Sequence, residues 1–282
     1  MSNKEYDIDE AYNPFTSDEA SKNYANADFL YEQSAVHSVK FLDPSSPDFD
    51  LIVDLGAGTG VSTEALFKAG APNLHVVEPS ESMISENKAR LGETDVKFIR
   101  AAAENFGAHF DKNVDVVYAL NCFHLFTNLK LILDQLKKSL KPGGRFVFNV
   151  SMPSFTFDEL STEEFVSVKA NRDFYKALEE HSQSPLIDNT IKLFNKILAG
   201  DTLDMVNKKG LIDAFFEFGF KFDNYDEYFI EGNAQAQKVI WELVATCLIT
   251  DGVERQSFLD NTKAPAKMLF RQAYFSFIVN DV

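Results

Sequence analysis

Closely spaced cysteines are missing from this sequence. It contains two cysteines, Cys122 and Cys247, and they form no Cys-x-x-Cys pair. Disulfide frameworks and cysteine-ligated zinc sites need such spacing, so the composition favours a reducing compartment and no structural zinc. The histidines show no His-Glu-His pattern either, and we expect no bound metal ion.

Basic residues are scarce relative to acidic ones. The 282 residues include 27 Lys and Arg against 43 Asp and Glu, which gives a formal net charge of -16. Proteins that bind nucleic acid neutralise phosphates with Lys and Arg, so this balance argues against DNA or RNA as a partner.

Long apolar runs are absent as well. Met1 to Tyr12 is polar and acidic, unlike a signal peptide, and the apolar stretch from Val239 to Ile249 is interrupted by Glu242. A helix needs about 20 apolar residues to cross a bilayer, so we expect a soluble, cytoplasmic protein without membrane contact.

Glycine, by contrast, is concentrated in one short stretch. The apolar run from Leu51 to Leu55 is followed by Gly56, Gly58 and Gly60, and a helical pattern begins at Val61. This order predicts a buried strand, a tight turn and a helix. Glycines lack Cβ atoms, so the turn can press its backbone N–H groups against a ligand.

Two common phosphate-binding motifs do not fit this turn. A dinucleotide fingerprint starting at Gly56 would require glycine at the position of Val61, and a P-loop would require lysine before Ser62. Pyrophosphate and ATP are therefore disfavoured as ligands.

The pattern Asp54-x-Gly56-x-Gly58-x-Gly60 resembles the first motif of class I S-adenosyl-L-methionine (SAM) dependent methyltransferases of the small-molecule type. Glu78 follows the apolar run from Leu74 to Val77, where members of that family carry an acidic residue that binds both ribose hydroxyls. The resemblance implies an α/β fold: a Rossmann-like, doubly wound, seven-stranded, mostly parallel sheet with a helical lid insertion. It implies SAM as the cofactor.

The same resemblance implies further cofactor contacts. Ala102 replaces the aspartate that many relatives use near adenine, which leaves that role to the segment that follows it. The full predicted set is Tyr24, Asp54, Gly56, Gly58, Gly60, Glu78, Pro79, Ser80, Met83, Ala103, Glu104, Asn105 and Asn121. For Tyr24 and Met83, ordinary core packing is the competing interpretation.

The predicted fourth strand, Val114 to Leu120, ends at the segment where we expect the chemistry. Asn121 follows it and can offer both a donor and an acceptor. His124 is the candidate catalytic base, because an imidazole titrates near neutrality. The alternative is that His124 only caps or stacks within the loop. Cys122 has no activating partner in the sequence, and we interpret it as a buried thiol.

The rest of the chain divides into segments by pattern. We expect a helical cap at 1–45, the cofactor-binding core at 46–150, a helical lid over substrate at 151–207, and the end of the sheet with a helical insertion at 208–282. In the cap, Thr16 and Glu19 form a capping-box pattern. An apolar stripe follows it, made of Phe29, Val36, Val39, Phe41 and Leu42.

These expectations favour transfer of a methyl group to an O, N or C nucleophile of a small, apolar or aromatic molecule. Two alternatives remain open: an enzyme of the cyclase type that binds SAM without methylating, and, with weaker support, a nicotinamide-dependent oxidoreductase. The expected partner is a small-molecule substrate, with homodimer formation possible.

Overall fold

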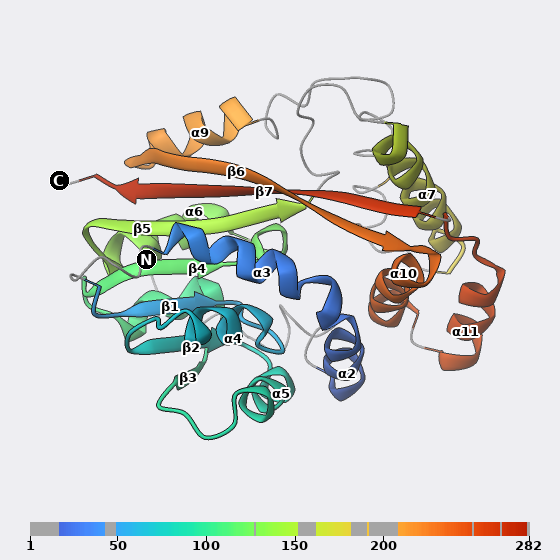
Figure 1. The fold of residues 1–282 in the computed structure, drawn as a ribbon, viewed down its shortest axis with the longest axis horizontal. Coiled ribbons are helices and arrows are strands. Elements are labelled where there is room, and N and C mark those ends of the chain that lie inside the picture. Colours follow the sequence, from blue (N-terminus) through green and yellow to red (C-terminus); the bar gives the residue numbers. More distant parts are fainter. Residues whose placement is uncertain are drawn as a thin grey trace.

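The computed structural model describes residues 17–42, 49–126, 128–151, 162–181, 191, 208–249, 251–265 and 267–280. Its centre is one seven-stranded sheet in the order β3-β2-β1-β4-β5-β7-β6 (Figure 1). Only β7 runs antiparallel to its neighbours, so the sheet is mostly parallel. The predicted fold class is confirmed.

The strands follow the apolar runs of the sequence closely. Their bounds are β1 Ile52–Leu55, β2 Leu74–Glu78, β3 Lys97–Arg100, β4 Val114–Ala119, β5 Leu140–Ser151, β6 Phe220–Asn233 and β7 Lys267–Val279. The residues of β1 and β4 are buried throughout, as expected for central strands covered on both faces.

Helices cover both faces of the sheet. The bounds of the α-helices are α2 Asp18–Ala27, α3 Glu32–Ser38, α4 Val61–Lys68, α5 Glu81–Leu91, α6 Leu129–Ser139, α7 Thr162–Leu178, α9 Lys208–Glu217, α10 Ala234–Leu248 and α11 Gly252–Asn261. Single turns of 3₁₀-helix, or slightly longer ones, lie at η2 Asp28–Leu30, η3 Val39–Phe41, η4 Ala103–His109 and η5 Phe123–Leu125. None of the described helices is long and apolar enough to cross a membrane.

Stacked phenylalanines fill the core between β5, β7 and α9. The rings of Phe148, Phe275 and Phe277 lie near-parallel, and Phe215 of α9 stacks on Phe277 with ring centroids 4.2 Å apart. Phe123 stacks on Phe148 at 4.1 Å and so ties the loop after β4 to this core. Aromatic packing on β5, β7 and α9 therefore supports the loop at the carboxyl end of β4.

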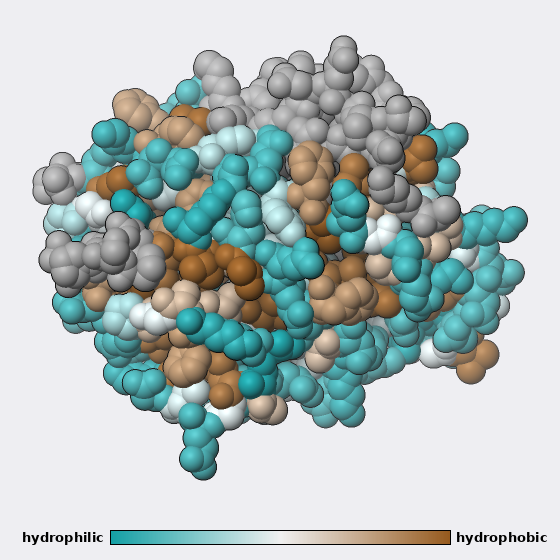
Figure 2. Space-filling model, in the orientation of Figure 1, coloured by the Kyte–Doolittle hydropathy of each residue, from teal (hydrophilic) through white to brown (hydrophobic). Residues whose placement is uncertain are grey.

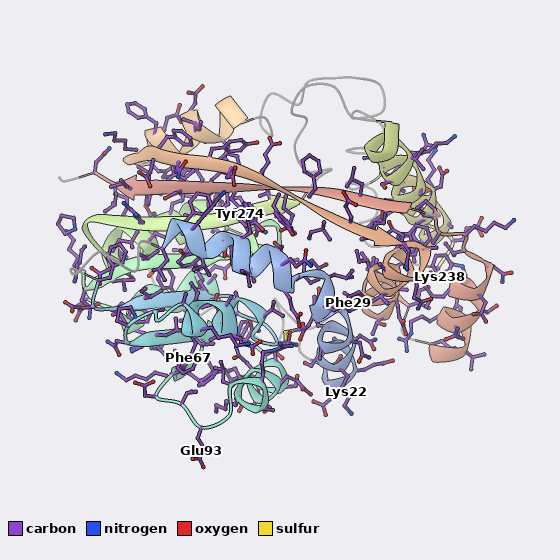
Figure 3. All side chains as sticks on the ribbon, viewed as in Figure 1. Lys22, Phe29, Phe67, Glu93, Lys238 and Tyr274 are labelled. Atoms are coloured by element: carbon purple, nitrogen blue, oxygen red, sulfur yellow. The ribbon has the colours of Figure 1, made fainter. Side chains whose placement is uncertain are left out.

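The predicted N-terminal stripe is wrong in part. The helix is broken at η2, and Ser17 accepts a capping hydrogen bond from the N–H of Ala20 at 3.1 Å, whereas Thr16 of the predicted capping box lies outside the described residues. The break changes the angle at which later side chains leave the helix. As a result, Phe29 and Val36 are 55% and 65% exposed, and Phe29 lies near the bend between α2 and α3 (Figure 3). Figure 2 shows the hydrophobic surface on the face that carries α3.

The fifth strand includes residues that are typical of a turn. It starts at Leu140, and Lys141-Pro142-Gly143-Gly144 lie within it. The pairing of β4 with β5 shifts register between Val114 and Val116, and Gly143 has a φ of +74°. A bulge thus absorbs the turn residues within the strand.

The last helices pack around Trp241 of α10. Its ring lies 4.7 Å from the ring of Phe174 on α7, nearly parallel, and Ile191 belongs to the same cluster. Phe174 is therefore part of the packing between helices rather than of a substrate pocket. Other aromatic residues of the predicted lid, Phe155, Phe157, Phe165 and Phe194, lie outside the described side chains.

Candidate active site at the carboxyl edge of the sheet

The glycine turn lies at the carboxyl end of β1, in the middle of the sheet. Gly56, Gly58 and Gly60 have φ angles of +71°, +53° and +94°, which favour glycine. A Cβ on Gly56 would lie 2.8 Å from Sγ of Cys122, and one on Gly60 would lie 2.3 Å from Oδ1 of Asn87. The turn is thus fitted against the loop after β4 on one side and against α5 on the other.

Glu78, at the end of β2, reaches this turn. Its Oε2 accepts a hydrogen bond from the N–H of Gly58 at 2.9 Å, and its Oε1 accepts one from the N–H of Ser80 at 3.0 Å. A carboxylate has about four acceptor sites. Each oxygen can therefore accept one more hydrogen bond, and the two backbone hydrogen bonds fix the orientation of the carboxylate.

Burial strongly affects the charge on Glu78. The residue is only 5% exposed, and desolvation raises the pKa of its carboxyl group to about 7. The two N–H bonds oppose that rise, and the negative charge of Asp54 adds to it. A ligand that donates hydrogen bonds to the carboxylate would favour its ionised form.

Asp54 lies beneath the turn and is completely buried. Its Oδ2 accepts hydrogen bonds from the hydroxyls of Ser62 and Thr63, both at 2.7 Å, which ties β1 to the first turn of α4. Its Oδ1 is buried with no hydrogen-bond partner among the described residues, and desolvation raises the pKa of Asp54 to about 6. An unpaired acceptor of this kind beside the turn fits a cationic or N–H-bearing ligand.

A cluster of ionic groups fastens the N-terminal cap to the turn. Asp28 of η2 accepts a hydrogen bond from the hydroxyl of Thr59 at 2.7 Å and forms an ion pair with Arg90 of α5. Arg90 also donates to the carbonyl of Thr59 at 3.2 Å and to Glu64 at 3.1 Å. The sequence alone did not single out Asp28, because a lone aspartate after a helix has no distinctive pattern.

Replacing Arg90 by alanine should lower the free energy of unfolding by about 2 kcal/mol. The change leaves Asp28 buried without its cation, which costs about 3 to 5 kcal/mol for fully buried pairs and less here because Arg90 is partly exposed. Lys130→Ala removes the exposed pair with Asp134 and should change stability by less than about 1 kcal/mol. Urea unfolding measures both effects. Equal losses of stability would contradict the role of Arg90 in joining the N-terminal cap to the glycine turn.

The predicted adenosine-side residues come together around the start of α5. Ser80 caps this helix, accepting from the N–H of Met83 at 3.3 Å, and both residues are buried. The carbonyl of Glu78 accepts from the N–H of Ala101 at 3.3 Å, which brings the segment after β3 alongside. Members of the predicted set in this region are Pro79, Ser80, Met83, Ala103, Glu104 and Asn105, of which Ala103 and Glu104 are buried in η4 and Asn105 is half-buried.

Other predicted residues lie further from the turn or are not described. The ring of Tyr24 packs, partly buried, on the cluster of Ala27, Leu30 and Ile230 between α2, β6 and α10. Its contact with a cofactor stays a prediction. The backbone of His124 lies in η5, but its side chain is outside the described part of the structure, so its role as a base stays a prediction too.

Asn121 and Cys122 follow β4 and border the glycine turn. Cys122 is buried, and its thiol donates to the carbonyl of Leu55 at 3.1 Å. Asn121 has a left-handed backbone with φ of +57°, and its side chain bonds to Asn149 and Gln272. Sequence analysis missed these two partners, although a polar amide inside an otherwise apolar strand is a signal.

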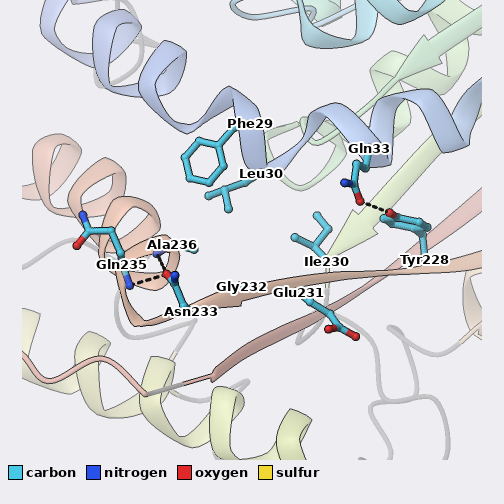
Figure 4. A pocket seen from close by; sticks show the side chains of 10 residues that line it. All are labelled: Phe29, Leu30, Gln33, Tyr228, Ile230, Glu231, Gly232, Asn233, Gln235 and Ala236. Atoms are coloured by element: carbon cyan, nitrogen blue, oxygen red, sulfur yellow. Dashed lines mark hydrogen bonds between the residues drawn. The ribbon is translucent and has the colours of Figure 1, made fainter.

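A pocket of about 430 Å³ lies beyond the cap (Figure 4). Phe29, Leu30 and Gln33 form one wall, and Ile230 of β6 belongs to the wall that faces them. The hydroxyl of Tyr228 donates to Gln33 at 2.8 Å across one end. The turn η2 separates this pocket from the glycine turn, since it contributes both Asp28 and the apolar wall.

These features fit SAM. The space beside Gly58 is open, since among the described residues only Sδ of Met83, at 3.7 Å, lies within 4 Å of an added Cβ. Glu78 offers two fixed acceptor positions for a diol, and the unpaired Oδ1 of Asp54 lies in the same acidic region. A cation with a ribose is the kind of ligand that this donor and acceptor set suits.

Comparisons with known proteins agree with this geometry. Residues 53–148 match a family model described as "Methyltransferase domain". The chain is 26% identical over 153 residues to malonyl-(acyl-carrier protein) O-methyltransferase 2 of Ilyobacter polytropus, covering 50% of this chain and 57% of that protein. It is 38% identical over 99 residues to demethylmenaquinone methyltransferase of Clavibacter sepedonicus, covering 34% of this chain and 39% of that protein. The matches thus span only about two fifths to three fifths of these relatives.

Solved structures share the fold. A putative methyltransferase from Bacillus halodurans superposes with a TM-score of 0.56 at 12% identity, covering 88% of this chain and all of that one. The phosphoethanolamine N-methyltransferase 2 of Haemonchus contortus, in complex with S-adenosyl-L-methionine, gives a TM-score of 0.57 at 11% identity, covering all of this chain and 62% of that one. Residues 53–148 thus match a methyltransferase domain, and the chain shares its fold with solved methyltransferase structures.

Proposed function

We propose that this protein transfers the methyl group of SAM to a small molecule. The observation that carries the proposal is the carboxylate of Glu78 held by the N–H groups of Gly58 and Ser80 beside an open glycine turn. In a methyltransferase domain this arrangement supports binding of the ribose diol at the end of β2. The remainder of the cofactor then extends past the glycine turn toward the carboxyl end of β4.

When bound, SAM supplies an electrophilic methyl group on a sulfonium ion. The contribution of the protein is mainly alignment, which is worth as much as about 7 to 11 kcal/mol in favourable cases. Glu78 binds the ribose, the glycine turn leaves room for the cofactor against its own main chain, and the loop after β4 lies beside the methyl-donating end. His124 on that loop is the proposed base for an acceptor whose nucleophile carries a proton.

The proposed acceptor is a small, apolar or aromatic molecule with an O, N or C nucleophile. The net charge of -16 disfavours polyanionic acceptors. The relative named demethylmenaquinone methyltransferase supports a small-molecule acceptor. We propose that residues 151–207 cover the acceptor as a lid.

Calorimetry with SAM, S-adenosylhomocysteine and NADH tests cofactor choice. We expect micromolar binding of the first two and none of NADH; binding of NADH alone would support the oxidoreductase alternative. Methyl-labelled SAM incubated with metabolite extracts should then yield a labelled small molecule. Tight SAM binding with no transfer to any extract would instead favour the cyclase-type enzyme.

A further inference from the structure

Three buried or half-buried amides connect the loop after β4 to β5 and β7. The backbone N–H of Asn121 donates to Oδ1 of Asn149 at 2.6 Å. The amide group of Asn149 donates to Oδ1 of Asn121 at 2.9 Å and to Oε1 of Gln272 at 2.8 Å. Gln272 in turn donates from Nε2 to Oδ1 of Asn121 at 2.8 Å. We call these three residues the amide cluster.

The order of donors and acceptors in the amide cluster follows from one backbone group. An N–H can only donate, so the atom of Asn149 that faces the N–H of Asn121 must be its oxygen. The other branch of Asn149 is then its NH₂ group, and both atoms that it faces must be oxygens. The orientation of every amide in the cluster is thus determined, although O and N differ little in shape.

The side of the cluster away from the site is anchored by hydroxyl groups. The hydroxyl of Tyr274 donates to Oε1 of Gln272 at 2.9 Å, and Ser34 of α3 donates to the same oxygen. The carbonyl of Ser34 lies 3.0 Å from the same hydroxyl and is an alternative acceptor for its single proton. Gln272 and Asn149 are 1% and 0% exposed, so this chain of bonds runs through the interior.

One polar group of the amide cluster has no partner among the described residues: the NH₂ group of Asn121. Its Oδ1 already accepts from Asn149 and Gln272, and in a planar amide the NH₂ group points the other way, away from β5 and β7. Asn121 is half-buried and adjoins Cys122, whose thiol abuts Gly56. The NH₂ group therefore lies at the edge of the sheet beside the first glycine of the turn.

We propose that Asn149 and Gln272 are positioning residues that hold the NH₂ group of Asn121 toward the methionine end of the cofactor, where it donates to the carboxylate. This inference rests on the proposed function, which puts the ribose at Glu78 and the methionine part toward β4. Of the two charged groups at that end, the carboxylate accepts hydrogen bonds and the ammonium cannot. The left-handed backbone of Asn121 is consistent with a residue held for this purpose.

The variant Asn149→Asp tests the proposal, because it reverses the order of donors and acceptors in the amide cluster without changing the shape of the side chain. Both oxygens of the introduced carboxylate accept, so Asn121 and Gln272 must turn their NH₂ groups inward, where that carboxylate and the hydroxyls of Ser34 and Tyr274 satisfy them. Asn121 would then present oxygen to the site. The probes are S-adenosylhomocysteine and methylthioadenosine, which share the adenosine and the thioether, but only the first carries the amino-acid end with its carboxylate and ammonium group.

At pH 8 we expect Asn149→Asp to weaken binding of S-adenosylhomocysteine at least about 10-fold and binding of methylthioadenosine less than about 3-fold. Loss of one hydrogen bond to a charged group predicts a difference of this size. Lowering the pH should reduce the difference between the losses of affinity for the two probes, because the introduced carboxyl group donates a hydrogen bond again once it is protonated. Titration of Glu78 does not change the ratio of the two affinities, since both probes carry the ribose and depend on Glu78 alike. Tyr274→Phe keeps the order of the amides and should leave both affinities within about 2-fold.

Equal weakening of both probes by Asn149→Asp, or no weakening of either, would overturn the positioning role while leaving the proposed function intact. Wild-type protein that binds neither probe would contradict the proposed function, and this inference with it. If Asn149→Asp does not fold, Gln272→Met removes one of the two bonds to Oδ1 of Asn121 and should weaken S-adenosylhomocysteine alone, by about 3-fold or more. Unchanged discrimination between the probes in that variant would equally overturn the proposal.

Discussion

The variant Gly60→Ala is expected to lose about 3 kcal/mol or more of its free energy of unfolding. Two costs combine at this position. The backbone has φ of +94°, where a side chain is strained by about 1 kcal/mol or more, and the new Cβ would lie 2.3 Å from Oδ1 and 2.4 Å from Cγ of Asn87. Asn87 is completely buried and donates to Thr63 at 2.9 Å, so it cannot move aside cheaply.

Gly70→Ala is the matched control for this variant. Gly70 has a similar φ of +82°, but no atom in the part of the chain that the structure describes lies within 4 Å of an added Cβ. Its substitution should cost only the backbone strain, about 1 kcal/mol. The difference between the two variants in urea unfolding therefore measures the clash with Asn87. A double-mutant cycle of Gly60→Ala with Asn87→Ala should show coupling of about 1 kcal/mol or more, and additive effects would contradict this packing of the turn on α5.

The strands and the glycine turn could be predicted because their causes are local. The runs at 51–55, 74–77 and 114–120 are apolar and bounded by turn residues, and each matches β1, β2 or β4 to within about a residue. The proximity of Glu78 to Gly58 also followed from a general rule, since the carboxyl ends of neighbouring parallel strands lie at the same edge. Local pattern and sheet topology together sufficed for the centre of the candidate site.

The errors arose where tertiary contacts override local pattern. The stripe through Phe29 and Val36 assumed a continuous helix, but Asp28 is drawn to Thr59 and Arg90 and the chain forms a 3₁₀ turn there. The outward rotation of Phe29 is a consequence. Spacing along a helix could not reveal this, because the partners of Asp28 lie about 30 and 60 residues away in the sequence.

The amide cluster lay beyond sequence reasoning for a similar reason. Asn149 and Gln272 are 123 residues apart, and they meet only because β7 inserts antiparallel between β5 and β6. Both strands lie in segments where the sheet was expected, but the register that pairs Val150 with Ala273 depends on the whole sheet. An amide within an apolar strand signals a buried polar contact without identifying its partner.

Replacement of Glu78 by glutamine should weaken binding of S-adenosylhomocysteine about 30- to 100-fold. A neutral amide offers one acceptor oxygen instead of two, and its NH₂ group faces the N–H of Gly58 or Ser80. The loss of charge-assisted hydrogen bonds to the diol is worth about 2 to 3 kcal/mol. Glu81→Gln, on the exposed first turn of α5, is the control and should leave calorimetric affinity unchanged. Similar affinities for the two variants would eliminate Glu78 as the sugar ligand.

Glu78 should also make cofactor binding depend on pH in a direction opposite to folding stability. Burial raises its pKa from the ordinary 4.5 to about 7, so its contribution to stability is complete below pH 4.5 and is lost as the pH rises through 7. The diol donates to the ionised form, so affinity for S-adenosylhomocysteine should increase from about pH 6 to about pH 8, with proton release on binding near the lower end of that range. Heats of binding measured in buffers of different ionisation enthalpy detect that release.

Opposite slopes separate this explanation from a general effect of acid on the protein. Asp54, with a pKa raised to about 6, also makes the free protein less stable as the pH rises, but it touches Ser62 and Thr63 rather than the proposed diol position. In Glu78→Gln the rise in affinity between about pH 7 and about pH 8, above the pKa of Asp54, should therefore vanish, while the part of the stability slope due to Asp54 persists. If affinity in that variant still rises over the same pH range, another group takes up the proton, and the carboxylate of Glu78 is not the acceptor that binds the ribose.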